Sequence, residues 1–180
     1  MTVRHQNRRL QHLTIEAALV TLIGCFLARP AAAADEPRNS RVRSSDRSII
    51  ALIDRATAES PTFRLLRTRF EASDGIVYIE PGHCGHGVRA CLIMWVGVSG
   101  PNRFLRILVD RRKADSDVDF MGTIGHELQH ALESLSERAV TDGHTLYHFF
   151  GRYAPTDGNR FETAAAIDVG EAVRLELRVH

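Results

Sequence analysis

The sequence lacks the features that assign many proteins to a class at once. It carries almost no net charge, because 23 Lys and Arg residues face 22 Asp and Glu residues and leave a formal charge of +1. Nucleic-acid-binding domains have a basic face or a high pI, so no nucleic-acid partner is expected. The chain also has no internal repeat and no low-complexity tract. What it does have is a processing signal, a cysteine pair and one metal-binding motif.

The first 34 residues have the layout of a secretory signal peptide. Basic residues within 4–9 precede an apolar stretch at 17–28, and small residues at 31–34 offer cleavage sites. The apolar stretch is about a dozen residues long, too short for a stable membrane span, so we expect none after cleavage. The sequence therefore predicts a periplasmic or secreted protein. Two alternatives stay open: an uncleaved N-terminal anchor, and a lipoprotein anchored through Cys25, which ends a lipobox-like sequence.

The rest of the chain is expected to form a flexible, polar lead-in at 35–47 and a single α+β domain at 48–180. Apolar periodicity predicts helices, and β-rich runs bounded by turn residues predict strands. The predicted helices cover 48–60, 62–72, 117–138, 144–152 and 160–178, and the predicted strands cover 76–79, 92–98 and 104–109. The simplest assembly is a small, mainly antiparallel sheet of hairpins, followed by the later helices.

Two cysteines remain after removal of the signal. Cys84 and Cys91 form an even pair in an exported chain, which predicts a disulfide that pins a hairpin turn. The alternative is a second, structural zinc site made by these cysteines with His83 and His86.

The metal-binding motif is His126-Glu127-Leu128-Gln129-His130, of the form H-E-x-x-H. In a helix, two histidines four residues apart lie on one face and can reach a single ion. Glu127 lies beside them, where it can take a proton from water activated by the metal. The surrounding residues support a helix, since apolar positions recur at helical spacing and Ser116 is a plausible N-cap. The alternative is a pair of solvated helix histidines.

A catalytic zinc ion usually has three protein ligands, so one ligand is missing from the motif. A third histidine six residues after His130 is excluded, because that position is Ser136. We expect Glu162, at the start of the final helix, to be the third ligand. Glu133, one turn after His130, is an alternative ligand with poorer geometry. Glu162 has an alternative interpretation as well, in which it only compensates the helix dipole.

H-E-x-x-H followed by a Glu on a downstream helix resembles the zincin metallopeptidases of the gluzincin type. The resemblance covers about residues 75–178. It implies a zincin-like fold, one Zn²⁺ per chain held by His126, His130 and Glu162, Glu127 as general base, and a peptide or protein substrate. The chain departs from the pattern at position 166, where Ala replaces an Asp that in many gluzincins supports a ligand His.

The resemblance also implies a group that stabilises the developing oxyanion. The candidates lie between the two ligand helices and are His144, Tyr147, His148 and Tyr153. Two further interpretations stay open: a zincin-like module that binds zinc without turnover, and a cell-envelope interaction domain in which the motif is a coincidence. The sequence predicts neither the substrate's sequence nor the oligomeric state.

Overall fold

The computed structural model describes residues 40–85, 87–153, 156–157 and 160–179. The predicted signal peptide lies outside the described residues. None of the described helices combines the length and the apolar character needed to cross a bilayer.

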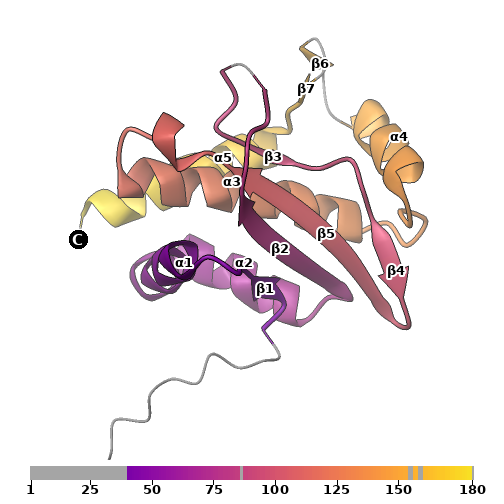
Figure 1. Cartoon of the computed structure of the whole chain (residues 1–180), viewed down its shortest axis with the longest axis horizontal. Helices are drawn as coiled ribbons and strands as arrows, with labels where there is room; N and C mark the ends of the chain where they lie inside the picture. Colours follow the sequence, from indigo (N-terminus) through magenta and orange to yellow (C-terminus); the bar gives the residue numbers. More distant parts are fainter. Residues whose placement is uncertain (1–39, 86, 154–155, 158–159, 180) are drawn as a thin grey trace, which may run out of the picture. The chain divides into compact units, whose positions relative to one another are not determined.

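The architecture is α+β, as the sequence predicts (Figure 1). The strands are β1 (Val42–Arg43), β2 (Gly75–Pro81), β3 (Ala90–Leu92), β4 (Gly97–Ser99), β5 (Asn102–Val109), β6 (Thr156–Asp157) and β7 (Arg160–Phe161). The helices are α1 (Arg47–Glu59), α2 (Pro61–Glu71), α3 (Asp117–Leu135), α4 (Gly143–Tyr153) and α5 (Ala164–Arg178), with a 3-10 turn η1 (Arg111–Lys113) before α3. The predicted N-cap of α3 is confirmed, since Ser116 accepts a backbone N–H group of the first turn, and Asp46 caps α1 in the same way.

The main sheet is mixed, which corrects the expected mainly antiparallel sheet of hairpins. Its order is β1-β2-β5-β3, with β4 also paired to β5. The β4–β5 hairpin forms around Gly100, whose φ of +56° suits the turn. However, β5 lies between β2 and β3, and it runs parallel to β2. Neighbouring strands in the sequence usually pair, but the eight-residue connection from β2 to β3 lets β3 pass beyond β5.

The expected lead-in is partly ordered. Val42 and Arg43 form β1, which pairs parallel with β2 at the edge of the sheet. Val42 is buried and belongs to the core. A two-residue strand with one apolar side chain has too little periodicity to be predicted from sequence, so residues 42–43 were wrongly placed in a flexible segment.

Helices cover one face of the sheet. Along β5 the side chains at 103, 105, 107 and 109 are buried, whereas Arg106 on the other face is exposed and pairs with Glu80. Arg103 explains why the apolar alternation of this strand is imperfect. Its guanidinium is buried, pairs with Asp74 and donates to the carbonyls of Leu135, Glu137 and Val140 at the end of α3. An inward arginine thus caps the long helix from the sheet.

Helix α3 packs most closely on α5, and glycines make this possible. A Cβ on Gly122 would lie 2.9 Å from the carbonyl oxygen of Gly170 and would also meet Arg174. A Cβ on Gly170 would lie 3.1 Å from the Cβ of His126. Gly122 and Gly125 are thus close-packing positions on α3, and the element that comes nearest to both is α5.

The loop between β2 and β3 is fixed at several points. A disulfide joins Cys84 and Cys91, as predicted, but it does not pin a hairpin turn, because β5 lies between β2 and β3. The ammonium group of Lys113 donates to the carbonyls of Gly85 and Val88, at 2.8 and 3.1 Å. His83 faces the carboxylate of Asp110. The disulfide leaves no thiolate for a structural zinc site, and β3 enters the sheet from a constrained loop.

Candidate metal centre

The two motif histidines lie on the inner side of α3 and face each other. Their Nε2 atoms are 3.2 Å apart, and their rings meet edge to face at 4.8 Å. The side chain of His130 is 6% exposed and that of His126 is 18% exposed. Both positions follow from the helix, because residues four apart share one face.

Glu162 reaches the two histidines from the segment just before α5. One of its carboxylate oxygens lies 3.1 Å from Nε2 of His126 and 3.8 Å from Nε2 of His130. One ligand atom of each of these three residues lies within 4.8 Å of the other two. The structure therefore brings together the three residues that the sequence predicted as ligands.

The local structure of Glu162 differs from the prediction. The final helix begins at Ala164 rather than Arg160, with Thr163 as its N-cap, and Arg160–Phe161 is the short strand β7. Glu162 thus lies on the connection between β7 and α5. The Thr163 hydroxyl accepts the N–H of Ala166, so the helix begins after Thr163, which the pattern of small residues did not reveal.

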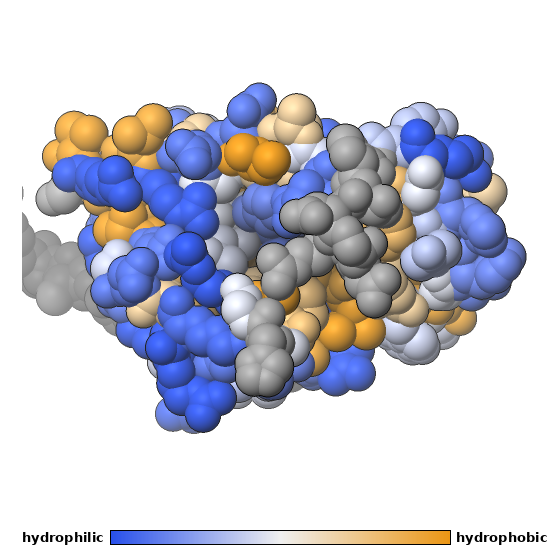
Figure 2. Space-filling model, turned by 90° about the horizontal axis from the view of Figure 1, so that it is seen from above, coloured by the Kyte–Doolittle hydropathy of each residue, from blue (hydrophilic) through white to orange (hydrophobic). Residues whose placement is uncertain are grey.

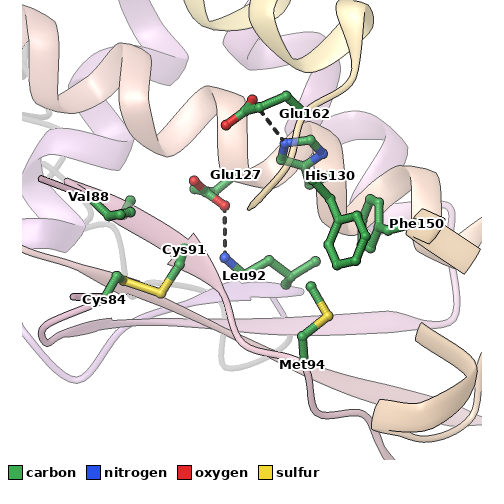
Figure 3. Close-up of a pocket in the computed structure, with 11 residues that line it drawn as sticks. Cys84, Val88, Cys91, Leu92, Met94, Glu127, His130, Phe150 and Glu162 are labelled. Atoms are coloured by element: carbon green, nitrogen blue, oxygen red, sulfur yellow. Dashed lines mark hydrogen bonds and ion pairs between the residues drawn. A yellow bond between two sulfur atoms is a disulfide. The ribbon is translucent and has the colours of Figure 1, made fainter. Parts of the chain in front are cut away.

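Glu127 is buried beside the ligand group. Its side chain points into a cavity that His130 and Glu162 also line, and one carboxylate oxygen accepts the backbone N–H of Leu92 at 2.8 Å (Figure 3). Burial raises the pKa of Glu127, and the two histidines and the Leu92 N–H partly oppose this effect. A carboxyl group with a raised pKa is suited to exchange protons near neutral pH.

Glu162 and His130 each shift the other's pKa toward the charged form. Hydrogen bonds from His126 and His130 hold the pKa of Glu162 well below its usual range. Burial would lower the pKa of His130, but the carboxylates of Glu133 and Glu162 outweigh it and raise that pKa to about 9. Two imidazoles and one carboxylate are a ligand set that zinc accepts, so the residues fit a zinc ion.

Glu133 lies on the opposite edge of the His130 ring from the ligand group. Its carboxylate is 3.3 Å from Nδ1 of His130, and the side chain is 16% exposed. It also accepts hydrogen bonds from Gln129 and Thr163. The sequence suggested Glu133 only as an alternative ligand. The interval of three residues from His130 to Glu133 could have indicated the actual contact, because it places the Glu133 carboxylate beside the His130 ring, on the Nδ1 edge.

A cavity of about 160 Å³ opens beside His130 and Glu162. Its remaining wall is apolar apart from Glu127, and it includes the disulfide. The wall residues are Cys84, Val88, Ala90, Cys91, Leu92, Met94, Phe150 and Phe161. Figure 3 shows this wall, with the ring of Phe150 next to that of His130. Apart from the cysteine pair, no sequence pattern marked these residues, because they come from the β2–β3 loop, β3, the loop after it, α4 and β7.

The four candidate oxyanion stabilisers do not line this cavity. His144 and His148 line another pocket, beside Glu137 and Arg152 on the outer side of α4. Tyr153 is 62% exposed. Tyr147 is the nearest candidate by contact, since its ring packs at 5.2 Å against Phe161, which does line the cavity.

Comparisons with known proteins add no assignment. The chain matches no protein-family model, no curated protein and no solved structure. A functional conclusion must therefore rest on the geometry of the site.

Proposed function

We propose that this protein is an exported, zinc-dependent metallopeptidase of the zincin type, which hydrolyses peptide or related amide bonds. The observation that carries the proposal is the convergence of His126, His130 and Glu162 beside the buried carboxylate of Glu127. The three convergent residues would hold the ion. A zinc ion in such a site supplies Lewis-acid catalysis and lowers the pKa of water toward 7.

Glu127 is the general base of the proposed reaction. The Leu92 N–H orients its carboxylate from β3, and the surrounding apolar wall keeps bulk water from it. The carboxylate takes a proton from the attacking water and later passes it to the leaving amine. Both transfers use the carboxylate oxygens that face the cavity.

The edge of β3 offers a place for an extended substrate. Ile93 makes a backbone hydrogen bond to β5 and Arg89 to Asp110 just after it, so the backbone groups of Ala90 and Leu92 point away from β5. The Leu92 N–H is donated to Glu127, which leaves the Leu92 carbonyl and the backbone groups of Ala90 for a substrate. Ala90 and Leu92 also line the cavity beside the ligands. An extended peptide can add to such an edge through main-chain hydrogen bonds, which places its scissile bond near Glu127.

The shape of the cavity favours an apolar side chain beside the scissile bond. The wall away from the ligands is formed by aliphatic and aromatic side chains and the disulfide, with no cation among its residues. In the view of Figure 2, hydrophobic side chains lie in separate groups among hydrophilic ones. We therefore propose a substrate recognised mainly through its backbone and one uncharged side chain.

An extracytoplasmic location fits the chemistry of the fold. The disulfide between Cys84 and Cys91 lies in the wall of the cavity and persists in an oxidising compartment. We propose a periplasmic or secreted protein, with lipid anchoring through Cys25 as the alternative.

A test separates catalysis from metal binding. Glu127→Gln keeps the size of the side chain but removes the base, so we expect hydrolysis of a mixed peptide library to fall about 10²- to 10⁴-fold. Zinc content of the purified protein should stay unchanged. Unaltered hydrolysis by this variant would contradict the proposed mechanism, and an absence of zinc in the wild-type protein would contradict the proposed site.

The second candidate function is a zincin-like module that binds zinc without turnover. It is favoured by one observation: none of the four oxyanion candidates reaches the described wall of the cavity. Tyr147→Phe distinguishes the two. A loss of hydrolysis with zinc retained assigns Tyr147 to the reaction, and an inactive wild-type protein with stoichiometric zinc supports the module.

A further inference from the structure

The third ligand lies on a segment that needs external support. The side chain of Glu162 is 46% exposed, and the residue belongs to neither β7 nor α5. Regular backbone hydrogen bonds therefore do not fix its position. Its two neighbours in the sequence do make defined contacts. Phe161 stacks on Phe150 at 5.8 Å, and Thr163 binds the carboxylate of Glu133.

Glu133 contacts both ligand-bearing segments. One oxygen lies 3.3 Å from Nδ1 of His130, on the metal helix α3. Both oxygens accept the Thr163 hydroxyl, at 2.9 and 3.0 Å, beside Glu162. Gln129 donates to the same carboxylate at 3.1 Å and keeps it in place. The Glu133 side chain thus contacts both the ligand His130 and Thr163, the residue next to the ligand Glu162.

The contact with His130 selects the form of the imidazole that binds a metal. A carboxylate beside Nδ1 favours a proton on that nitrogen, which leaves the lone pair of Nε2 free. Nε2 of His130 is the atom that faces His126 and Glu162. Glu133, on the Nδ1 edge, therefore orients the His130 ring and also fixes its tautomer.

The position of Glu133 excludes it from the ligand set. It lines a separate cavity of about 650 Å³, together with Arg69, Phe149 and Tyr153, and it is not part of the wall of the metal cavity. Its oxygens approach His130 from Nδ1, whereas the convergent ligand atoms lie at Nε2. The alternative ligand suggested by the sequence thus faces away from the ion.

We propose that Glu133 is the positioning residue of the metal centre, fixing the ring of His130 directly and the segment of Glu162 through the Thr163 hydroxyl. This inference rests on the proposed zinc site. In many gluzincins an Asp at the position of Ala166 supports a ligand His. Ala166 cannot do this, because its side chain is a buried methyl group at the start of α5, and Glu133 takes that role in this chain. Glu133 contacts neither substrate nor ion, so its effect is on affinity for the metal.

The test measures zinc affinity of the metal-free full chain by competition with a chromogenic chelator. Glu133→Gln should weaken zinc binding about 10- to 100-fold, the usual effect of removing a group that orients a ligand. Thr163→Val removes the hydroxyl and should weaken binding as well, whereas Thr163→Ser should restore it. Because both residues act through one contact, the double variant should lose less than the product of the two single effects.

Glu176 provides a matched control. It also accepts hydroxyl groups near a helix N-terminus, those of Ser60 and Thr62 at α2, but it contacts none of the histidines that the structure describes. Glu176→Gln should lower the melting temperature and leave zinc affinity unchanged. The ¹⁵N signals of His130 in the metal-free protein, recorded above pH 9 where the imidazole is neutral, supply a second readout, since a purely structural role of Glu133 would not change the tautomer.

The outcomes are distinct. Zinc affinity of Glu133→Gln equal to that of the wild type, with binding still lost in His130→Ala, overturns this inference and leaves the proposed zinc site intact. Equal losses in Glu133→Gln and Glu176→Gln also overturn it, because they indicate a general loss of stability. A wild-type protein that binds no zinc removes the proposed site itself.

Discussion

Helices α3 and α4 each carry two histidines four residues apart, and the local geometry of the two pairs is nearly the same. Nε2 of His126 and Nε2 of His130 are 3.2 Å apart, and Nε2 of His144 and Nε2 of His148 are 3.0 Å apart. The rings meet edge to face in both pairs, with centroids 4.8 and 4.3 Å apart. The helix alone produces this geometry, so it does not distinguish a metal centre from a surface pair.

The surroundings of the two pairs differ. The pair on α3 lies in the interior, with Glu162 on its Nε2 side and Glu133 beside His130 Nδ1. The pair on α4 is exposed, and its pocket holds Arg152, whose guanidinium pairs with Glu137. In the part of the chain that the structure describes, three potential ligand side chains converge only at the α3 pair. A third potential ligand from another element, with the residues that support it, is what distinguishes the α3 pair from the α4 pair.

The largest expected effect comes from removing one ligand of the α3 pair. His130→Ala should abolish stoichiometric zinc, because two remaining ligands do not hold the ion against competition from water and buffer. His148→Ala is the matched variant on α4 and should leave the zinc content unchanged. Metal analysis of the purified proteins measures both. Zinc lost through His148→Ala would place the metal at α4 and refute the comparison.

A pH effect should also separate the pairs. Glu133 and Glu162 raise the pKa of His130 from 6.5 to about 9 in the metal-free protein. A raised pKa in the folded state stabilises the protein fully below pH 6.5, and this contribution is lost as the pH rises through 9. Unfolding by urea after chelation should therefore show a loss of up to about 3 kcal/mol between these values. The loss should be absent in His130→Gln, and its persistence there would assign it to another group.

The smallest expected effects test the close approach of α5 to α3. Gly122→Ala places a Cβ 2.9 Å from the Gly170 carbonyl oxygen, and overpacking should cost about 1–3 kcal/mol of unfolding free energy. Gly151 is the matched glycine on α4, and a Cβ there meets nothing within 4 Å. Gly151→Ala should stabilise the protein by about 0.5–1 kcal/mol, since Ala is the better helix former. Thermal unfolding measures both, and a neutral Gly122→Ala would show that the helices can separate at little cost.

The fold could be predicted only in part. The α+β class, the long helix with its Ser116 cap and the Cys84–Cys91 disulfide follow from local patterns. The parallel pairing of β2 with β5 does not, because it depends on which strands meet across a long connection. The short strand β1 and the late start of α5 at Ala164 depend on single contacts that leave no periodic signal.

The sequence by itself determined the spacing of His126, Glu127 and His130, since a helix converts intervals of one and four residues into fixed directions. It also indicated that a carboxylate from a later segment was needed, and Glu162 was the best candidate. Only the tertiary structure decided that Glu162 reaches the pair, that Leu92 holds Glu127 and that Glu133 supports His130. The physical reason is that these contacts join elements distant in the chain, and their distances depend on packing between helices and sheet.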